Sequence, residues 1–342
     1  MEPSFKNSGG LLLKTGEMGE RDFLAKISSF VDKPQGAVLG FDDDASDIPV
    51  SADNNLVVNV DTFVRKTDWL PGMTPAQVGR KTAVMALSDL AAKGAKPLAI
   101  MLSLCVPEDY DVEDAIELIR GFSHYGLKSG IPYLGGDIGM CNDVVLTGVA
   151  LGTASPEEIV SRCGARENDV VAVTGNFGLT SIAFEVLIRG REAEADLRQD
   201  ALAAAYRPKI YSDFVSSLTM IGAITASMDS SDGLGITLHT IAKMSNCGIS
   251  IDTLPTTPEV ESFCRDNNLE TLKTVMQGGE EFLLVLTIPP AMFDEAMDVA
   301  RKTNVELKKI GTVTSGNQVV LKTKEGHAEI PNTGYDNFKE WE

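Results

Sequence analysis

Between residues 56 and 153, apolar β-branched runs alternate with long amphipathic segments, and this alternation restricts the chain to folds that combine a sheet with helices. Thr74 and Gln77 form a capping box around a proline at the first helical position, which predicts a helix of about 19 residues that Gly94 ends. A second helix is predicted over 111–129. Strands are predicted at 56–60, 98–106 and 143–153. The pattern indicates an α+β or α/β domain that ends near residue 153.

A second series of elements follows the polar turn at 161–169. Strands are predicted at 170–174, 248–252, 281–288 and 319–323, and helices at 208–225, 233–245 and 290–303. The charged segment 190–200 has no apolar stripe, so it is predicted to be an exposed loop or the start of a helix. Because 342 residues exceed the usual size of one domain, we expect two domains, covering 1–153 and 154–342.

The net charge of −19 limits the partners of this chain. Such a charge repels the phosphate backbone of nucleic acids, so we expect no nucleic-acid partner. It also repels nucleotides, and a protein of this charge that binds ATP needs divalent cations between itself and the phosphates. The five cysteines form no CxxC pair and no zinc-ligand spacing, which indicates reduced thiols in a cytoplasmic protein.

The most apolar stretch, 83–106, is interrupted by Asp89, Lys93 and Lys96, so no run approaches the roughly 20 uncharged residues of a membrane span. The amino end lacks the basic region and apolar segment of a secretion signal. We therefore expect a cytoplasmic protein without a membrane partner.

The common nucleotide-binding motifs are missing from the sequence. Residues 121–129 read GFSHYGLKS, but Leu127 separates Gly126 from Lys128, and a Walker A loop needs the lysine directly after the glycine. The glycine-rich loop, HRD and DFG motifs of protein kinases are not found either. Any use of ATP must therefore depend on other groups.

Aspartates recur beside glycine or serine in short, turn-like settings: Asp42, Asp43, Asp44, Asp61, Asp89, Asp137, Asp229 and Asp232. A single aspartate of this kind is usually a solvated surface residue. Together, at strand ends and glycine turns, they are where ligands for magnesium and its shared phosphates would stand. The set predicts a site with several metal ions.

The segment 230–233 precedes a predicted helix and has two readings that are compatible. Ser230, Ser231 or Asp232 can simply cap the helix. Alternatively, the free N–H groups at the helix start can bind phosphate oxygens or orient carboxylates toward metal.

Nine segments occur in the order found in one known family: FDDDA, NVDTFV, SDLAAKGAKP, GGD, SRCGA, VTGNFG, MDSSDGL, GGEEF and GYDNF, which begin at residues 41, 59, 88, 135, 161, 173, 228, 278 and 334. On these motifs the chain resembles the thiamine-monophosphate kinase family, of the superfamily that includes aminoimidazole ribonucleotide synthetase. The resemblance implies an α+β protein of two domains, each a mixed sheet packed with helices, that forms homodimers through the amino-terminal sheets. Domain 1–153 would bind magnesium and ATP, and domain 154–342 would complete the active site.

The resemblance also implies roles for individual residues. Metal ligands would be Asp43, Asn59, Val60, Asp61, Asp89, Asp137, Asp229 and Asp232, with Asp229 and Asp232 closest to the chemistry. Nucleotide contacts would come from Gly136, Asp137, Arg162 and Ser231, and contacts to the acceptor, thiamine monophosphate, from Asp68, Glu280 and Tyr335. Three positions depart from the family pattern. Asn59 and Val60 stand where the family usually has threonine or serine, and Val60, without a side-chain oxygen, offers only its carbonyl. Asp68 stands where many members have histidine.

The resemblance implies direct in-line transfer of the γ-phosphoryl group of ATP. An acceptor phosphate is already a nucleophile at neutral pH, so no histidine base is expected. Sister enzymes that need a cysteine in an amino-terminal loop or at the carboxyl end fit poorly, because the first cysteine is Cys105 and the sequence ends KEWE. An enzyme similar to aminoimidazole ribonucleotide synthetase and a non-catalytic nucleotide-binding regulator remain as alternatives.

Overall fold

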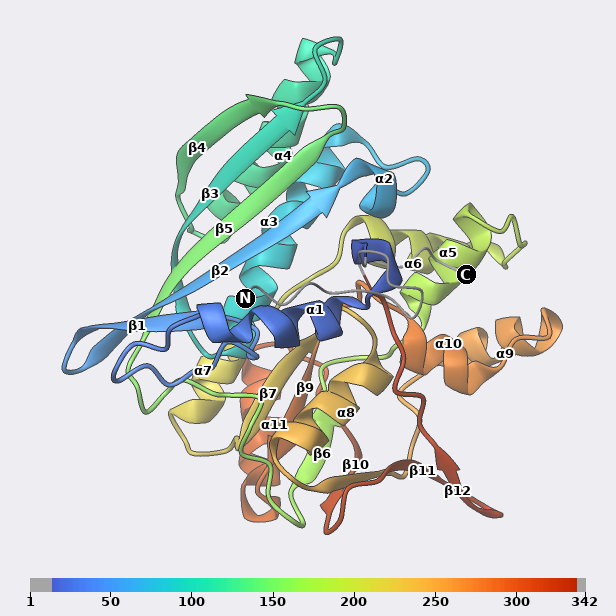
Figure 1. The fold of residues 1–342 in the computed structure, drawn as a ribbon. Helices are drawn as coiled ribbons and strands as arrows, with labels where there is room; N and C mark the ends of the chain where they lie inside the picture. Colours follow the sequence, from blue (N-terminus) through green and yellow to red (C-terminus); the bar gives the residue numbers. More distant parts are fainter. Residues whose placement is uncertain (1–13, 337–342) are drawn as a thin grey trace.

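The computed structural model describes residues 14–336, and the chain forms two sheets, each packed with helices (Figure 1). This arrangement confirms the predicted α+β class with two mixed sheets. The last family motif is described only through Asp336, since Asn337 and Phe338 lie outside the described residues, as do residues 1–13. Within the described part, no helix combines the length and apolar composition that a bilayer crossing requires.

The amino-terminal sheet has the strand order β1-β2-β5-β3-β4. Its strands are β1 Ser46–Ser51, β2 Asn54–Val64, β3 Lys96–Val106, β4 Tyr133–Met140 and β5 Val145–Ala154. Only the β3–β4 pair is parallel. Helices α3 (Pro75–Ala92) and α4 (Val112–Lys128) cover one face (Figure 1). Alternate side chains such as Val57, Leu102 and Leu146 are buried beneath them, whereas Val60 points to the other face and is 59% exposed.

The predicted capping box at the start of α3 is present, because Thr74 and Gln77 each accept a hydrogen bond from the other's backbone N–H. Helices α3 and α4 approach each other closely at two glycines. A Cβ atom on Gly79 would lie 1.8 Å from the carbonyl oxygen of Leu118, and one on Gly121 would lie 2.0 Å from that of Ala76. The helix pair can therefore pack in this way only without side chains at these positions.

The second sheet has the order β12-β11-β8-β10-β6-β9-β7. Its strands are β6 Val170–Val173, β7 Ala226–Ser230, β8 Gly248–Ile251, β9 Leu283–Ile288, β10 Lys308–Thr314, β11 Val319–Thr323 and β12 Gly326–Glu329. The helices outside the first layer are α1 Glu20–Ile27, α2 Arg65–Asp68, α5 Leu179–Leu187, α6 Ala195–Tyr206, α7 Phe214–Thr219, α8 Leu234–Met244, α9 Pro258–Asp266, α10 Thr271–Gln277 and α11 Phe293–Lys302.

All four residues of β6 are buried because helices cover both faces of this sheet. Val171 and Val173 belong to the core that includes α8, whereas Val170 and Ala172 belong to the core that includes α7 and α11. A strand covered on both sides is uniformly apolar, as the sequence of β6 is.

One predicted helix differs from the structure, and the prediction for a charged segment agrees with it. The helix predicted at 208–225 is wrong over its first part, since only Phe214–Thr219 is helical. The carbonyl of Pro208 accepts a hydrogen bond from Arg80 Nη2 at 2.7 Å rather than from a helical amide. The charged segment at 190–200 does contain a helix start: α6 begins at Ala195, with Leu197 buried.

Candidate active site

Three carboxylates meet where the two sheets adjoin. Asp44 comes from the loop before β1, Asp89 from the last turn of α3 and Asp229 from β7. One carboxylate oxygen from each lies within 4.8 Å of the others. The group therefore draws on both halves of the chain, and we call it the aspartate triad.

Hydrogen bonds from two polar neighbours fix the triad. The amide of Asn59, on β2, donates to Asp89 Oδ2 at 2.5 Å. The hydroxyl of Ser88 donates to Asp229 Oδ2 at 2.6 Å, a bond that joins α3 to β7. Both carboxylates thus keep a defined orientation.

The triad carries more negative charge than its surroundings balance. Burial raises the pKa of Asp229 to about 7, and the negative charge of Asp44 contributes. Burial and the charges of Asp229 and Asp44 hold the pKa of Asp89 well above its ordinary value. Carboxylates that resist ionisation for these reasons favour a cation beside them.

Lys93, at the end of α3, neutralises the loop that precedes β1. Its fully buried ammonium donates to Asp43 Oδ1 at 2.6 Å and to the carbonyl of Ser227 at 2.7 Å. It also lies 2.6 Å from Asp44 Oδ2. This lysine links α3, the aspartate loop and β7 through a single charge.

Asp43 differs from the triad in its electrostatics. Burial alone would raise the pKa of Asp43, but the charges of Lys93 and Arg162 hold it below its usual value. Its second oxygen accepts hydrogen bonds from the Ser161 hydroxyl at 2.8 Å and the Arg162 amide at 3.1 Å. The predicted metal ligand Asp43 is thus engaged by protein groups, and its neighbour Asp44 stands in the triad.

The Arg162 side chain is only 19% exposed and holds the same loop. Its Nε donates to Asp44 Oδ1 at 2.8 Å and its Nη1 to the carbonyl of Asp42 at 2.6 Å. The predicted nucleotide contact therefore sits beside the triad with its guanidinium already paired to carboxylate.

A second acidic pair adjoins the first group. Burial, with the charges of Asp232 and Asp68, raises the pKa of Asp61 to about 7. Burial likewise raises the pKa of Asp232 to about 6, although Arg21 of α1 lies 3.3 Å from its Oδ2. The structure thus brings the predicted residues Asp61 and Asp232 into one electrostatic group.

The predicted acceptor residues Asp68 and Tyr335 meet beside this group. Tyr335 donates its hydroxyl to Asp68 Oδ1 at 3.4 Å and its backbone N–H to the carbonyl of Asp232 at 3.0 Å. The other oxygen of Asp68 accepts the N–H of Val64 at 2.7 Å. The segment that carries Tyr335 is therefore anchored next to Asp232.

Glu280 is held by its backbone and by a buried lysine. Its φ of +63° is rare for a residue other than glycine, and its N–H donates to the carbonyl of Ser231 at 2.6 Å. Its carboxylate contacts the fully buried ammonium of Lys81. Strained backbone of this kind persists where the surrounding contacts fix it, often at functional sites.

Three residues predicted for the site lie away from the triad of the same chain: Val60, Gly136 and Asp137. Strand pairing aligns Asp61, Gly148, Leu102 and Gly136 in one row across the sheet. Asp137 follows Gly136, so its side chain points to the opposite, open face, as does that of Val60. Two strands separate β2 from β4, which places Asp137 roughly 14 Å from Asp61. A Cβ atom on Gly136 would lie 1.8 Å from the Leu102 carbonyl, so strand packing already requires this glycine.

The start of α8 lacks a side-chain cap. Gly233 is the N-cap residue, and neither Ser231 nor Asp232 accepts a hydrogen bond from the helix. Among the described residues, the structure therefore does not show the side-chain capping of the first reading.

Sequence reasoning missed several residues that shape this site: Lys81, Ser88, Lys93 and Ser161. Asp44 was in the predicted aspartate set, although the resemblance implied Asp43 as the metal ligand of this loop. Ser88, Lys93 and Ser161 lie inside the motifs SDLAAKGAKP and SRCGA, but their roles could not be read from the sequence, because their partners are distant; the partner of Ser88 is 141 residues away. Lys81 lies outside the nine motifs and gave no signal.

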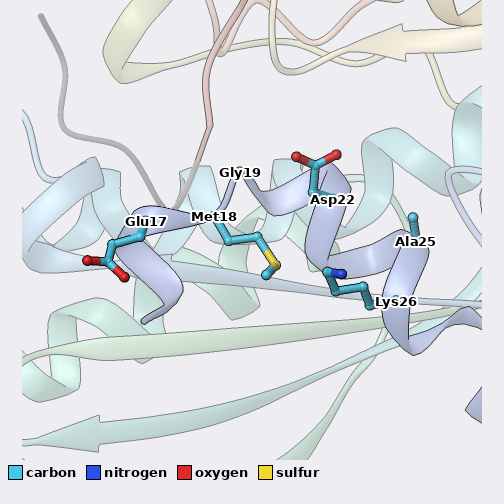
Figure 2. A pocket seen from close by; sticks show the side chains of 6 residues that line it. All are labelled: Glu17, Met18, Gly19, Asp22, Ala25 and Lys26. Atoms are coloured by element: carbon cyan, nitrogen blue, oxygen red, sulfur yellow. The ribbon is translucent and has the colours of Figure 1, made fainter. Parts of the chain in front are cut away.

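A separate pocket of about 470 Å³ lies beside α1 (Figure 2). It is lined by Glu17, Met18, Gly19, Asp22, Ala25 and Lys26, which all come from α1 and the turn before it. Because one short segment supplies the whole lining, and none of the predicted site residues belongs to it, this pocket is not the candidate active site.

Comparisons with family models, related sequences and solved structures all match this chain to the same group of proteins. Residues 42–154 match AIR synthase related protein, N-terminal domain, and residues 166–324 match AIR synthase related protein, C-terminal domain. The chain is 31% identical to a thiamine-monophosphate kinase of Nitrosopumilus maritimus over 83% of this chain and 90% of the relative. It resembles the crystal structure of tt0281 from Thermus thermophilus, with a TM-score of 0.81, 30% identity and coverage of 92% and 98% of the two chains. A thiamine monophosphate kinase from Aquifex aeolicus has a TM-score of 0.72 and 26% identity, with coverage of 84% and 92%.

Proposed function

The chain belongs to the thiamine-monophosphate kinase family of AIR synthase related proteins, and from this premise we propose that it phosphorylates thiamine monophosphate with ATP to give thiamine diphosphate. The observation that carries the proposal is the aspartate triad. It joins the two halves of the chain at residues that the family motifs contain.

The residues present fit magnesium. Hard divalent cations prefer carboxylate oxygens, and the triad supplies three oxygens within 4.8 Å of one another. Asp44 is paired with Lys93 and Arg162, whereas burial raises the pKa of both Asp89 and Asp229. We propose that Asp89 and Asp229 hold metal directly and that Asp61 and Asp232 hold metal beside them. When bound, magnesium would neutralise the phosphate oxygens that the acidic chain otherwise repels.

The protein's own groups position the two substrates. The uncapped start of α8 and Ser231 offer N–H and hydroxyl groups to nucleotide phosphates. In the transfer, an oxygen of the acceptor phosphate attacks the γ-phosphorus, and the bond to the bridging oxygen of ADP breaks. No residue has to remove a proton, because the acceptor phosphate is already ionised.

The acceptor side is formed by Asp68, Glu280 and Tyr335. Tyr335 offers an aromatic face suited to a thiamine ring, and its hydroxyl is fixed by Asp68. Glu280 is oriented by Lys81 and by its bond to Ser231. We propose that these residues select the acceptor, while both domains share the magnesium ions, through Asp61 and Asp89 of domain 1–153 and Asp229 and Asp232 of domain 154–342.

We further propose that Asp137 acts in a second copy of the chain. Asp137 lies on the open face of the amino-terminal sheet, and so does the exposed apolar side chain of Val60. A homodimer that covers this face would bring Asp137 toward the site of its partner, which one chain alone cannot do.

Turnover assays test the proposal. ATP hydrolysis or transfer should require thiamine monophosphate, yield thiamine diphosphate, and stop when EDTA removes magnesium. Asp89→Asn should lower kcat by at least about a hundredfold while circular dichroism shows a folded chain, because the change removes charge and keeps shape. ATP turnover without thiamine monophosphate would favour an enzyme like aminoimidazole ribonucleotide synthetase, and nucleotide binding without turnover would favour a regulator.

A further inference from the structure

A second pocket, of about 400 Å³, lies between α3 and α4 at the end of α3 that is far from the triad. Its walls come from the first two turns of α3, the second half of α4 and the residue that follows α6. From Gln77 to Asp89 the axis of α3 rises by about 18 Å, so the pocket is distinct from the aspartate triad. Its volume lies in the range of small-molecule sites.

The charge of this pocket opposes that of the whole molecule. Its lining includes Arg80, Arg120, Lys128 and Arg207, together with His124, and none of the described residues that line it is a carboxylate. The surface that faces the cavity is mostly apolar, so these side chains line it largely with carbon atoms. In a chain of net charge −19, the four charged ends around the cavity still form a local positive region.

Protein groups leave much of this charge unpaired. Arg80 donates Nη2 to the carbonyl of Pro208 and lies 4.8 Å from the ring centroid of Tyr125, but its buried Nη1 has no hydrogen-bond partner among the described residues. Arg120 contacts Glu117. Within the described chain, neither the Lys128 ammonium nor the Arg207 guanidinium is involved in any hydrogen bond or ion pair.

Like charges at this pocket oppose one another. Burial lowers the pKa of Arg80, the neighbouring Tyr125 opposes this effect, and the like charge of Arg207 adds to it. A buried guanidinium nitrogen without a partner costs free energy. Arginine pairs with phosphate oxygens through two parallel hydrogen bonds, so two arginines that face one cavity favour phosphate over other anions.

We propose that this pocket binds a small organic phosphate monoester, with its phosphate between Arg80 and Arg207 and its organic part against Tyr125 and the helix surfaces. Inorganic phosphate shares the charge but leaves most of the 400 Å³ unfilled, so it should bind more weakly. The site is separate from both proposed substrate sites.

The probe for the test is 4-bromophenyl phosphate, whose bromine gives anomalous scattering in a crystal of the full chain. We expect one bromine peak between α3 and α4, and a dissociation constant by calorimetry at least tenfold lower than that of inorganic phosphate. Arg207→Ala should weaken binding of the probe at least tenfold, and Lys128→Ala should weaken it severalfold. Lys302→Ala is the matched control, since Lys302 also lies in the last turn of an exposed helix, and it should change nothing.

Three outcomes would overturn the proposal. The first is a bromine peak only at the triad or near Tyr335. The second is an adventitious ion only, seen as a peak at soaking concentration without a measurable dissociation constant in solution. The third is unchanged affinity in both Arg207→Ala and Lys128→Ala while thermal melting shows that each variant is folded.

Discussion

At the scale of single residues, the buried ammonium of Lys93 decides the state of the loop that carries Asp43 and Asp44. The side chains of both aspartates are at most 1% exposed, and Lys93 lies 2.6 Å from each. A buried charge that loses its partner is far more costly than a surface charge. Lys93 therefore positions Asp44 of the triad together with its neighbour Asp43.

We predict that Lys93→Met lowers the free energy of unfolding by about 3 kcal/mol or more, because it leaves buried carboxylates unpaired. Urea denaturation measures this change. Adding magnesium should restore part of the loss in the variant, since a divalent cation replaces the missing charge, and Asp44→Asn combined with Lys93→Met should be more stable than Lys93→Met alone.

The exposed Lys243→Met serves as the control and should change stability by less than about 0.5 kcal/mol. A Lys93→Met variant as stable as the wild type, in EDTA, would contradict the role of Lys93.

The aspartates of the site could be found from the sequence because their signal is local. Asp89, Asp229 and Asp232 stand beside serine or glycine at the ends of elements, where metal ligands occur. Lys93 and Lys81 could not be recognised in this way. A lysine is normally exposed, and its burial is explained only by carboxylates that are distant in sequence, such as Asp43, 50 residues away.

At the scale of elements, local capping predicted α3 well, whereas tertiary contacts shortened the helix expected at 208–225. The box between Thr74 and Gln77 lies within four residues, so the sequence contains all of it. The contact of Arg80 with Pro208 spans 128 residues and removes a carbonyl that a longer helix would need. Helix propensity therefore determines where a helix can form, and tertiary packing determines how long the helix becomes.

The crossing of α3 and α4 gives a prediction at this scale. Gly79→Ala should destabilise the chain by roughly 3 kcal/mol, because the new Cβ would lie 1.8 Å from the Leu118 carbonyl and the helices must separate. The measurement is the midpoint of urea denaturation. Gly130→Ala is the comparison: nothing lies within 4 Å of its Cβ, so its positive φ alone should cost about 1 kcal/mol. Equal losses in the two variants would argue against the steric explanation.

Glu281 gives a pH-dependent prediction at the start of α5. Its carboxylate, only 7% exposed, accepts a hydrogen bond from the N–H of Gly178 at 2.7 Å, yet burial raises its pKa to about 7. Between pH 4.5 and 7 the native state holds this proton and the unfolded chain does not. Stability therefore falls as pH rises through this range, by at most roughly 3 kcal/mol from this group.

We predict that Glu281→Gln removes this contribution, so the variant gains stability relative to the wild type as pH rises from 4.5 to 7 and the difference stays constant above 7. Glutamine keeps the acceptor for Gly178. Urea denaturation at several pH values measures the difference, and a difference that does not change with pH would show that Glu281 is ionised in the native state throughout.

At the scale of the whole molecule, the open face of the amino-terminal sheet remains to be explained. Its side chains include Ile48 and Val60, 48% and 59% exposed. Alternation along β2 could be read from the sequence, but which strands pair, and thus which face the helices leave open, depends on the order β1-β2-β5-β3-β4. The opposite orientations of Asp61 and Asp137 follow from that order and from the register.

The final prediction tests whether two copies share each active site. Asp137→Asn and Asp229→Asn should each be nearly inactive when pure. If Asp137 acts on the site of the partner, a mixed dimer of the two variants contains one intact site, with Asp229 from one chain and Asp137 from the other. Random mixing of equal amounts makes half of the dimers mixed, so about a quarter of the wild-type activity should return. Light scattering should show the dimer mass before and after mixing, and subunits should be mixed in mild denaturant and refolded to permit exchange. If both residues act in the same chain, no mixture contains an intact site, and activity stays at the level of the pure variants.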